Sequence, residues 1–239
     1  MSEELCRTIR SSYTNFLDLG ASLNFKSLAF ASKGEAPGAF FDYSYNKNLE
    51  YFLFDSNSLQ NNLSTKIAKN VMIKDISDFY FNVFSKLFWK ESINLSDIKK
   101  MFSKELSLSN SKCVLAINNG EIAGFISGYP TIHKEISALF NNQNVFFISH
   151  LGVSKDFRNN NIGEIMTTHI YNEIVEAKYN GIVARIDKNV KPSQKICQKF
   201  GLINTNTSSI DFPNRFFWVK KLSPHIEMKI RSNLRPRTI

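Results

Sequence analysis

Residues 145–164 read VFFISHLGVSKDFRNNNIGE, and this stretch decides the fold. Its first nine residues, 145–153, are mostly apolar and predict a strand. The next eight residues are polar except for Phe157 and include three asparagines, which predicts a loop. A helix is then predicted to begin at Ile162, because apolar residues recur at helical spacing, namely Ile162, Ile165, Met166, Ile170, Ile174 and Ala177.

The junction between this strand and this helix has the properties of an anion site. The first backbone N–H groups of a helix lack partners within the helix, and its macrodipole places about half a positive charge there. Arg158 adds a full positive charge, and the asparagines that follow it tolerate the backbone conformations of a tight loop. The sequence therefore predicts a site for phosphate or pyrophosphate at 158–163. A polar connecting loop without a ligand is the alternative.

Downstream, Gly181 is predicted to end the helix and residues 182–186 to form the next strand. A further helix is expected from Pro192 to Phe200, with Gly201 as its C-cap. Two final strands are expected at 202–209 and 216–222. His169 falls on the inner stripe of the helix from Ile162 and is interpreted as structural.

Upstream, the sequence predicts a strand at 49–54, a short strand at Val71–Ile73 and a helix from Ile76 to Phe88. A second helix, capped by Ser96, is predicted to follow. Strands are then predicted at 113–117 and 122–127, joined by a tight turn at Asn118-Asn119-Gly120, and a looser segment at 130–144 leads to the strand at 145–153. In this looser segment no role is predicted for His133 or Glu135. The order of strands and helices predicts an α/β (α+β) fold, a mixed sheet flanked by helices.

Composition narrows the class of protein. The chain has 239 residues and a mass of 27.4 kDa, with 43% hydrophobic and 21% charged residues, which is enough apolar material for a core and excludes a disordered chain. No apolar run reaches the ~18 residues of a membrane span, and the start lacks the apolar stretch of a signal peptide. Three widely spaced cysteines, with no CxxC pair, predict neither disulfides nor a metal site. We therefore expect a cytoplasmic protein that binds neither metal nor membrane.

The charge balance points to an acidic ligand without identifying it. Thirty Lys and Arg against 21 Asp and Glu give a net charge of +9, which suits nucleic acid, acidic lipid or a phosphorylated small molecule. The sequence contains no recognition-helix or zinc-finger pattern, so nucleic acid is not expected as a partner.

The segment Arg158-Asn-Asn-Asn161-Ile-Gly163 resembles the R/Q-x-x-G-x-G/A loop of the GNAT superfamily of N-acetyltransferases, which cradles the pyrophosphate of acetyl-coenzyme A. The segment from Asn189 to Leu202 is similar to the family's N-x-x-(A/S)…Y-x-K-x-G-F pattern. The resemblance covers about residues 71–222. It implies a GNAT-like fold with a mostly antiparallel central sheet. The implied domains are an N-terminal α/β extension at 1–66, which has the character of a reduced GNAT-like half, an acetyltransferase domain at 67–223 and a basic tail at 224–239.

The resemblance implies an enzyme that moves an acetyl group from acetyl-CoA to a primary amine by direct attack in a ternary complex. The residues it assigns to the coenzyme are Leu151, Gly152, Val153, Arg158, Asn159, Asn160, Asn161, Ile162, Gly163, Glu164, Asn189 and Ser193. Asn161 stands in place of the first loop glycine, and it is among the best non-glycine residues for a left-handed backbone. We therefore expect the binding of the coenzyme to be retained.

Two residues are candidates for the proton transfers. His150 lies on the strand beside the expected thioester and could act as the base, because the pKa of histidine suits neutral pH; a buried structural histidine is the alternative. Cys197 stands where many family members carry a tyrosine that is credited as the acid for the departing thiolate. Its thiol could donate that proton or could be a small core filler.

Two other functions fit the same resemblance. The acceptor could be a nucleotide-linked amino sugar, since such acetyltransferases also carry an extra N-terminal part. The protein could also be a non-catalytic CoA-binding or interaction module, because the family's tyrosine is missing. The acceptor expected is therefore a small-molecule amine or amino sugar, and the protein is expected to be a monomer or a homodimer.

Overall fold

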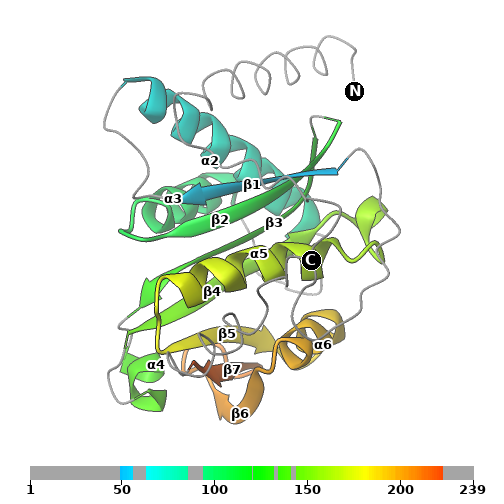
Figure 1. The fold of residues 1–239 in the computed structure, drawn as a ribbon. Coiled ribbons are helices and arrows are strands. Elements are labelled where there is room, and N and C mark those ends of the chain that lie inside the picture. The colour runs from blue at the N-terminus through cyan, green and yellow to red at the C-terminus, as the bar shows by residue number, and fades with distance from the viewer. Residues whose placement is uncertain are drawn as a thin grey trace, which may run out of the picture. The chain divides into compact units, whose positions relative to one another are not determined.

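The computed structural model describes residues 49–55, 63–85, 94–119, 121–131, 134–140 and 144–222. The elements within these residues are β1 (Leu49–Asp55), α2 (Leu63–Phe84), α3 (Leu95–Glu105), β2 (Lys112–Asn118), β3 (Glu121–Thr131), α4 (Lys134–Leu139), β4 (Val145–Val153), η2 (Lys155–Phe157), α5 (Ile162–Glu176), β5 (Gly181–Asp187), α6 (Lys191–Lys199), β6 (Ile203–Ser208) and β7 (Arg215–Lys221). Figure 1 labels the α-helices and the strands. None of these helices combines the length and the apolar character needed to cross a bilayer.

The described strands form a sheet in the order β1-β2-β3-β4-β5-β7-β6. β2 pairs antiparallel with both β1 and β3, and β7 pairs antiparallel with both β5 and β6. β4 and β5 pair in parallel, as expected for two strands joined by the helix α5. The prediction of a mixed, mostly antiparallel sheet flanked by helices is confirmed.

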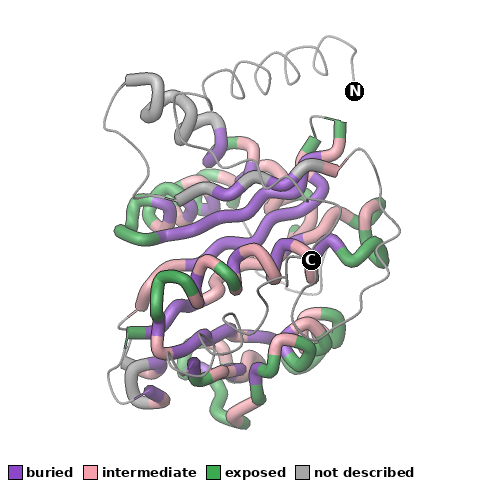
Figure 2. Tube along the Cα trace, in the orientation of Figure 1, coloured by how far each residue is buried: buried purple, intermediate pink, exposed green. Residues whose placement is uncertain are grey.

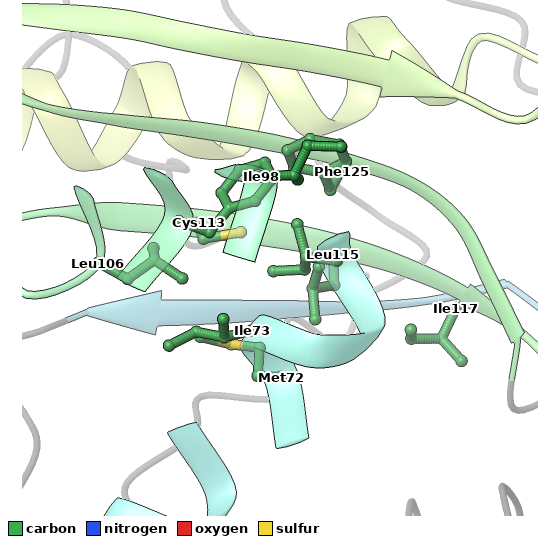
Figure 3. Packing of buried hydrophobic residues seen from close by; sticks show 10 residues of the cluster. Met72, Ile73, Ile98, Leu106, Cys113, Leu115, Ile117 and Phe125 are labelled. Carbon is green, nitrogen blue, oxygen red and sulfur yellow. The ribbon is translucent and has the colours of Figure 1, made fainter. Parts of the chain in front are cut away.

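The chain divides into two compact units. The first contains Ser44–Tyr129 and Ser149–Ile170, and so holds β1, α2, α3, β2, β3, the end of β4 and the start of α5. Its core lies between α2, α3 and the strands β2 and β3; Figure 3 shows Met72, Ile73, Ile98, Leu106, Cys113, Leu115, Ile117 and Phe125 packed there. Consecutive residues of β2 and β3 are buried along most of their length (Figure 2), so both faces of these strands are covered.

Of the described residues, the second unit contains 130–131, 134–140, 144–148 and 171–222. The first four residues of β4 pair with the first four of β5 in this unit, from Val145 with Gly181 to Ile148 with Ala184. Gly181 must be glycine, because a Cβ at this position would lie 2.1 Å from Cε1 of Phe140. The core of this unit includes the fully buried rings of Phe140, Phe146 and Phe217.

Three predicted element boundaries are wrong. Val71–Ile73 lies inside α2, where Ser77 Oγ donates to the carbonyl of Ile73 at 2.6 Å. The cap of α3 is Asn94, whose side chain accepts the N–H of Ser96 at 2.8 Å. The helix α5 ends at Glu176, and the left-handed residue after it is Lys178 (φ 58°), while Gly181 opens β5.

The segment predicted as loose, 130–144, also contains structure. β3 extends to Thr131, and the helix α4 follows at Lys134–Leu139. Other predictions lie outside the described residues: the end of the helix at Phe88, Gly120 in the hairpin turn, His133, and most of the proposed extension and tail. Within the range 1–66, β1 is described and pairs with β2.

Candidate active site

The loop between β4 and α5 is held by short backbone contacts. Ser154 donates its N–H to the carbonyl of Ala123 at 2.9 Å, which ties the end of β4 to β3. The 3-10 turn η2 follows, and the guanidinium Nε of Arg158 donates to the carbonyl of Val153 at 3.3 Å. Residues 158–161 are exposed. The predicted loop is therefore an ordered, solvent-accessible segment.

Two asparagines give this loop its shape. Asn159 and Asn161 have φ values of 65° and 57°, in the left-handed region that favours glycine. Between them, the Nδ2 group of Asn160 contacts the carbonyls of Phe157 and Arg158, each at 3.4 Å. Asn161 thus takes the backbone conformation that a loop glycine would take, and the substitution of glycine by asparagine preserves the path of the chain.

The first turn of α5 presents backbone N–H groups at the end of the loop. The carbonyl of Asn161 accepts the N–H of Ile165 at 3.0 Å, so Ile162, Gly163 and Glu164 supply the N–H groups that precede the first intrahelical bond. The macrodipole adds partial positive charge at the same end of the helix. Backbone donors, a dipole and the nearby Arg158 together suit a phosphate or pyrophosphate group.

A close approach at Gly124 seats this helix on the sheet. A Cβ at Gly124 would lie 2.9 Å from Cε of Met166, 3.3 Å from Cγ2 of Ile162 and 3.0 Å from the carbonyl oxygen of Gly152. Gly152 faces the helix α2, because a Cβ added at Gly152 would lie 3.0 Å from Cε2 of Phe84 in that helix. The glycines of β3 and β4 therefore allow helices to pack closely on the two faces of the sheet.

The second half of β4 continues beyond its ladder with β5. The described β4–β5 pairing ends at Ile148, whereas β4 remains extended to Val153. Leu151 and Val153 are half-buried and Gly152 is buried. These three residues are the ones that the resemblance assigns to the coenzyme on this strand, and they lie beyond the parallel ladder.

His150 lies in an aromatic environment on the α2 and α3 side of the first unit. Its ring centroid is 5.3 Å from that of Tyr80, 5.2 Å from that of Phe102 and 6.4 Å from that of Phe125. Its Nε2 lies 3.2 Å from Oε1 of Glu105. The side chains of His150 and Glu105 are only 14% and 15% exposed, so both are largely shielded from water.

Glu105 and Ser149 are functional candidates that the sequence reasoning missed. Ser149 Oγ donates to Oε2 of Glu105 at 2.9 Å, and the hydroxyl of Ser127 lies 3.3 Å from Ser149 Oγ. Consecutive side chains of a regular strand point to opposite faces, yet Ser149 and His150 both contact Glu105. The two oxygens of one carboxylate thus reach two consecutive residues of β4. No local sequence signal joins Glu105 to residues 44 and 45 positions away.

The other predicted residues, Asn189, Ser193 and Cys197, belong to the second unit. Asn189 precedes α6 and donates its N–H to Oδ1 of Asp187 at 2.8 Å, and Ser193 lies half-buried in the first turn of α6. Cys197 is a free, buried thiol on α6, and burial raises its pKa to about 12. Such a thiol stays protonated at neutral pH.

Two residues outside the predicted site have structural contacts. His169 on α5 packs against Tyr51 of β1 with ring centroids 5.6 Å apart, and burial lowers its pKa to about 4. The carboxylate of Glu135 on α4 accepts the N–H of Ile210 at 2.8 Å and the hydroxyl of Ser209 at 3.3 Å. These contacts are consistent with the structural role predicted for His169 and give Glu135 a role in fixing the loop between β6 and β7.

Comparisons with known proteins agree with this arrangement. The model of the acetyltransferase (GNAT) family matches residues 72–202. Similar solved structures include the NatC complex bound to Gag peptide and CoA (TM-score 0.51, 11% identity, 74% of this chain and 99% of that chain). A GNAT-family acetyltransferase from Streptococcus pneumoniae is also similar (TM-score 0.51, 13% identity, 73% of this chain and 100% of that chain). So is a mosquito arylalkylamine N-acetyltransferase like 5b (TM-score 0.52, 10% identity, 64% of this chain and 96% of that chain).

The structural likeness concerns the fold, since the sequence identities are low. No curated protein sequence matches the chain significantly. The family model spans more than half of the chain and includes the loop of left-handed asparagines and the start of α5. The chain therefore belongs to the GNAT family of acetyltransferases, and it is an acyltransferase.

Proposed function

We propose that this protein transfers an acetyl group from acetyl-CoA to a primary amine in a ternary complex. The observation that carries the proposal is the loop that leads from β4 into α5. It combines the left-handed backbone of Asn159 and Asn161, the donors of the first turn of α5 and the cation of Arg158 in one contiguous segment, whose residues 158–161 are exposed. These features match a ligand with two linked phosphates.

In this proposal the coenzyme is held along β4 and over the start of α5. The pyrophosphate accepts hydrogen bonds from the backbone of residues 158–164. The backbone of Leu151–Val153 binds the pantetheine arm and supplies a donor to the oxygen of the thioester carbonyl, which becomes negatively charged as the amine attacks. The resemblance also assigns Asn189 and Ser193, which belong to the second unit, to the coenzyme. The protein's main contribution to the rate is then position and orientation.

The reaction requires an uncharged amine, and His150 is the proposed base. An ammonium acceptor gives one proton to His150, directly or through water, and the free amine attacks the carbonyl carbon of the thioester. The new C–N bond forms, the C–S bond breaks, and the second proton of the nitrogen passes to the departing sulfur. General base catalysis of this kind contributes about 10²–10⁴-fold.

Cys197 is assigned to packing in this proposal. Its thiol is buried, and its pKa of about 12 makes it a weaker acid than the tyrosine it replaces, whose usual pKa is about 10. The proton for the sulfur therefore comes from the attacking nitrogen. Cys197→Ala is expected to retain kcat within about a factor of two, and acetyl transfer measured with this variant tests the assignment.

The first test of the function is thermal unfolding with acetyl-CoA, followed by release of CoA with a panel of primary amines that includes nucleotide-linked amino sugars. Acetyl-CoA at ~100 times its dissociation constant stabilises the folded state by about 2.7 kcal/mol. For a chain of this length the melting temperature rises by roughly 5 to 10 °C. Acetyl-pantetheine, which lacks the pyrophosphate, should give a much smaller rise at the same concentration.

A loop variant separates coenzyme binding at the proposed site from binding elsewhere. Gly163→Trp places a large side chain in the first turn of α5 and should abolish the thermal rise, while Asp97→Asn, on the exposed surface of α3, should preserve it. Absence of any rise with the wild-type protein would contradict coenzyme binding. A rise without transfer to any amine would favour a non-catalytic CoA-binding module.

A further inference from the structure

A carboxylate at the end of α3 reaches the strand that carries the proposed base. Glu105 is the last residue of α3, and its two oxygens contact two consecutive residues of β4, His150 through Nε2 at 3.2 Å and Ser149 through Oγ at 2.9 Å. The C-terminal end of a helix carries partial negative charge, so a carboxylate there is unfavourable for the helix itself. The donors from β4 offset this cost.

The contact determines which nitrogen of His150 carries the proton. A carboxylate only accepts hydrogen bonds, so Nε2 of the neutral ring must be the N–H that points to Glu105. The lone pair of the neutral imidazole is then on Nδ1. Ser149 Oγ donates to the other oxygen of Glu105 at 2.9 Å, and it also lies 3.2 Å from the carbonyl oxygen and 3.3 Å from the hydroxyl of Ser127. These contacts place the carboxylate between the side chains of His150 and Ser149.

The surroundings of the pair strengthen the contact. The rings of Tyr80, Phe102 and Phe125 surround His150, and hydrogen bonds between charged groups are stronger where water is excluded. The pKa of the Cys113 thiol in β2 is raised mainly by burial and to a smaller extent by the negative charge of Glu105. Cys113 therefore stays neutral beside the carboxylate, and the groups that face His150 are Tyr80 from α2 and Glu105 from α3.

We propose that Glu105 is a positioning residue, which fixes His150 in the Nε2–H form so that Nδ1 receives the proton of the acceptor ammonium. The inference rests on the proposed role of His150 as the base. When Nδ1 takes the proton, the ring becomes an imidazolium whose positive charge lies beside the carboxylate of Glu105. The ring returns this proton to solvent after the product leaves.

The first measurement uses the full-length wild-type protein and needs no acceptor. The ¹⁵N shifts of the His150 ring distinguish the two neutral tautomers, with His150→Gln used for assignment. The expected result is one form, protonated on Nε2. An Nδ1–H form, or an even mixture of the two, would overturn the proposal whether or not an acceptor has been identified.

The second measurement compares Glu105→Gln with Asp97→Asn, an exposed carboxylate on the same helix. Glu105→Gln keeps the size and a hydrogen-bonding group but removes the charge that favours the imidazolium. We expect kcat to fall by about tenfold, a part of the ~10²–10⁴-fold that a general base contributes. The KM for acetyl-CoA should stay within about a factor of two, and the acid limb of the pH profile should move to lower pH. Asp97→Asn should change none of these.

The outcomes separate the two proposals. If His150→Gln retains full kcat, His150 is not the base, and the mechanism of the proposed function fails together with the role of Glu105. If His150→Gln loses activity while Glu105→Gln lowers only the melting temperature, with kcat and the pH profile unchanged, Glu105 is structural and only the positioning role is overturned. Loss of kcat in both variants, with the acid limb moved to lower pH in Glu105→Gln, supports both proposals.

Discussion

At position 161 the backbone takes a left-handed conformation with a side chain attached. Asn161 has a φ of 57°, and this conformation costs an ordinary side chain roughly 1–2 kcal/mol. Asn161→Gly should keep the affinity for acetyl-CoA and slightly raise stability, whereas Asn161→Val should destabilise the loop by about that amount and weaken binding. Titration calorimetry with acetyl-CoA measures the affinity. Equal affinities of the glycine and valine variants would contradict this account of the loop.

Burial of His169 makes the stability of the protein depend on pH. The pKa of His169 is lowered from 6.5 to about 4, so the unfolded chain binds a proton at a higher pH than the folded protein does. Stability is therefore fully present above pH 6.5 and is lost as the pH falls toward 4. From about pH 7 to about pH 5 the loss from this residue is about 2 kcal/mol.

Urea unfolding at these two pH values tests this expectation, with His169→Phe as the comparison. Phenylalanine keeps an aromatic ring against Tyr51, whose ring centroid is 5.6 Å from that of His169, but does not titrate. The variant should lose about 2 kcal/mol less than the wild type on acidification. The same loss in both proteins would show that His169 titrates normally in the folded state.

At the scale of elements, one side chain of α4 joins this helix to the loop between β6 and β7. Glu135 accepts hydrogen bonds from Ile210 N–H and Ser209 Oγ, and Arg185 of β5 donates to the same hydroxyl at 3.2 Å. Glu135→Ala leaves these donors without their acceptor, so we expect a loss of about 1–3 kcal/mol of stability. Amide exchange at Ile210 should become faster, while Asp211→Asn in the same loop should have little effect. Unchanged exchange in Glu135→Ala would contradict the contact.

Elements defined by a long pattern were predicted well, and short ones were not. The strand at 145–153 has the predicted bounds and the helix from Ile162 has the predicted start, because apolar residues persist over several turns or pleats. For Val71–Ile73 the sequence predicts a short strand, but three consecutive apolar residues are too few to distinguish the period of a strand from that of a helix. They lie in α2, where Met72 and Ile73 are buried against the core, so tertiary packing decides the structure of this short run.

At the scale of the whole molecule, the net charge of +9 should favour the encounter with a coenzyme that carries several phosphates. The screening length falls from about 30 Å at 0.01 M salt to about 3 Å at 1 M. We therefore expect kcat/KM for acetyl-CoA to fall by roughly tenfold over this range. Acetyl-pantetheine is uncharged and serves as the control. An equal fall for both donors would show that salt acts on the protein and not on the encounter.

The candidate site was predictable only where its residues are neighbours in the sequence. The loop 158–163 could be recognised because its charge, its asparagines and the helix start are contiguous. Glu105 could not, because it meets Ser149 and His150 only after α3 packs near β4, 44 and 45 residues away. The state of Cys197 also depends on tertiary burial, which raises its pKa. Sequence spacing gives neither the contact nor the burial.

The hairpin between β2 and β3 has a chemical consequence over time. Asn119 is exposed, has a φ of 50° and is followed in the sequence by glycine, whose small size allows the next backbone nitrogen to attack the asparagine amide. The cyclic imide that forms opens to aspartate or isoaspartate with loss of ammonia. Asn180 also precedes a glycine, but its N–H is bonded to the carbonyl of Asn144 at 2.8 Å and Gly181 is buried in β5. Stored protein should therefore age first at Asn119, and each event lowers the net charge of +9 by one.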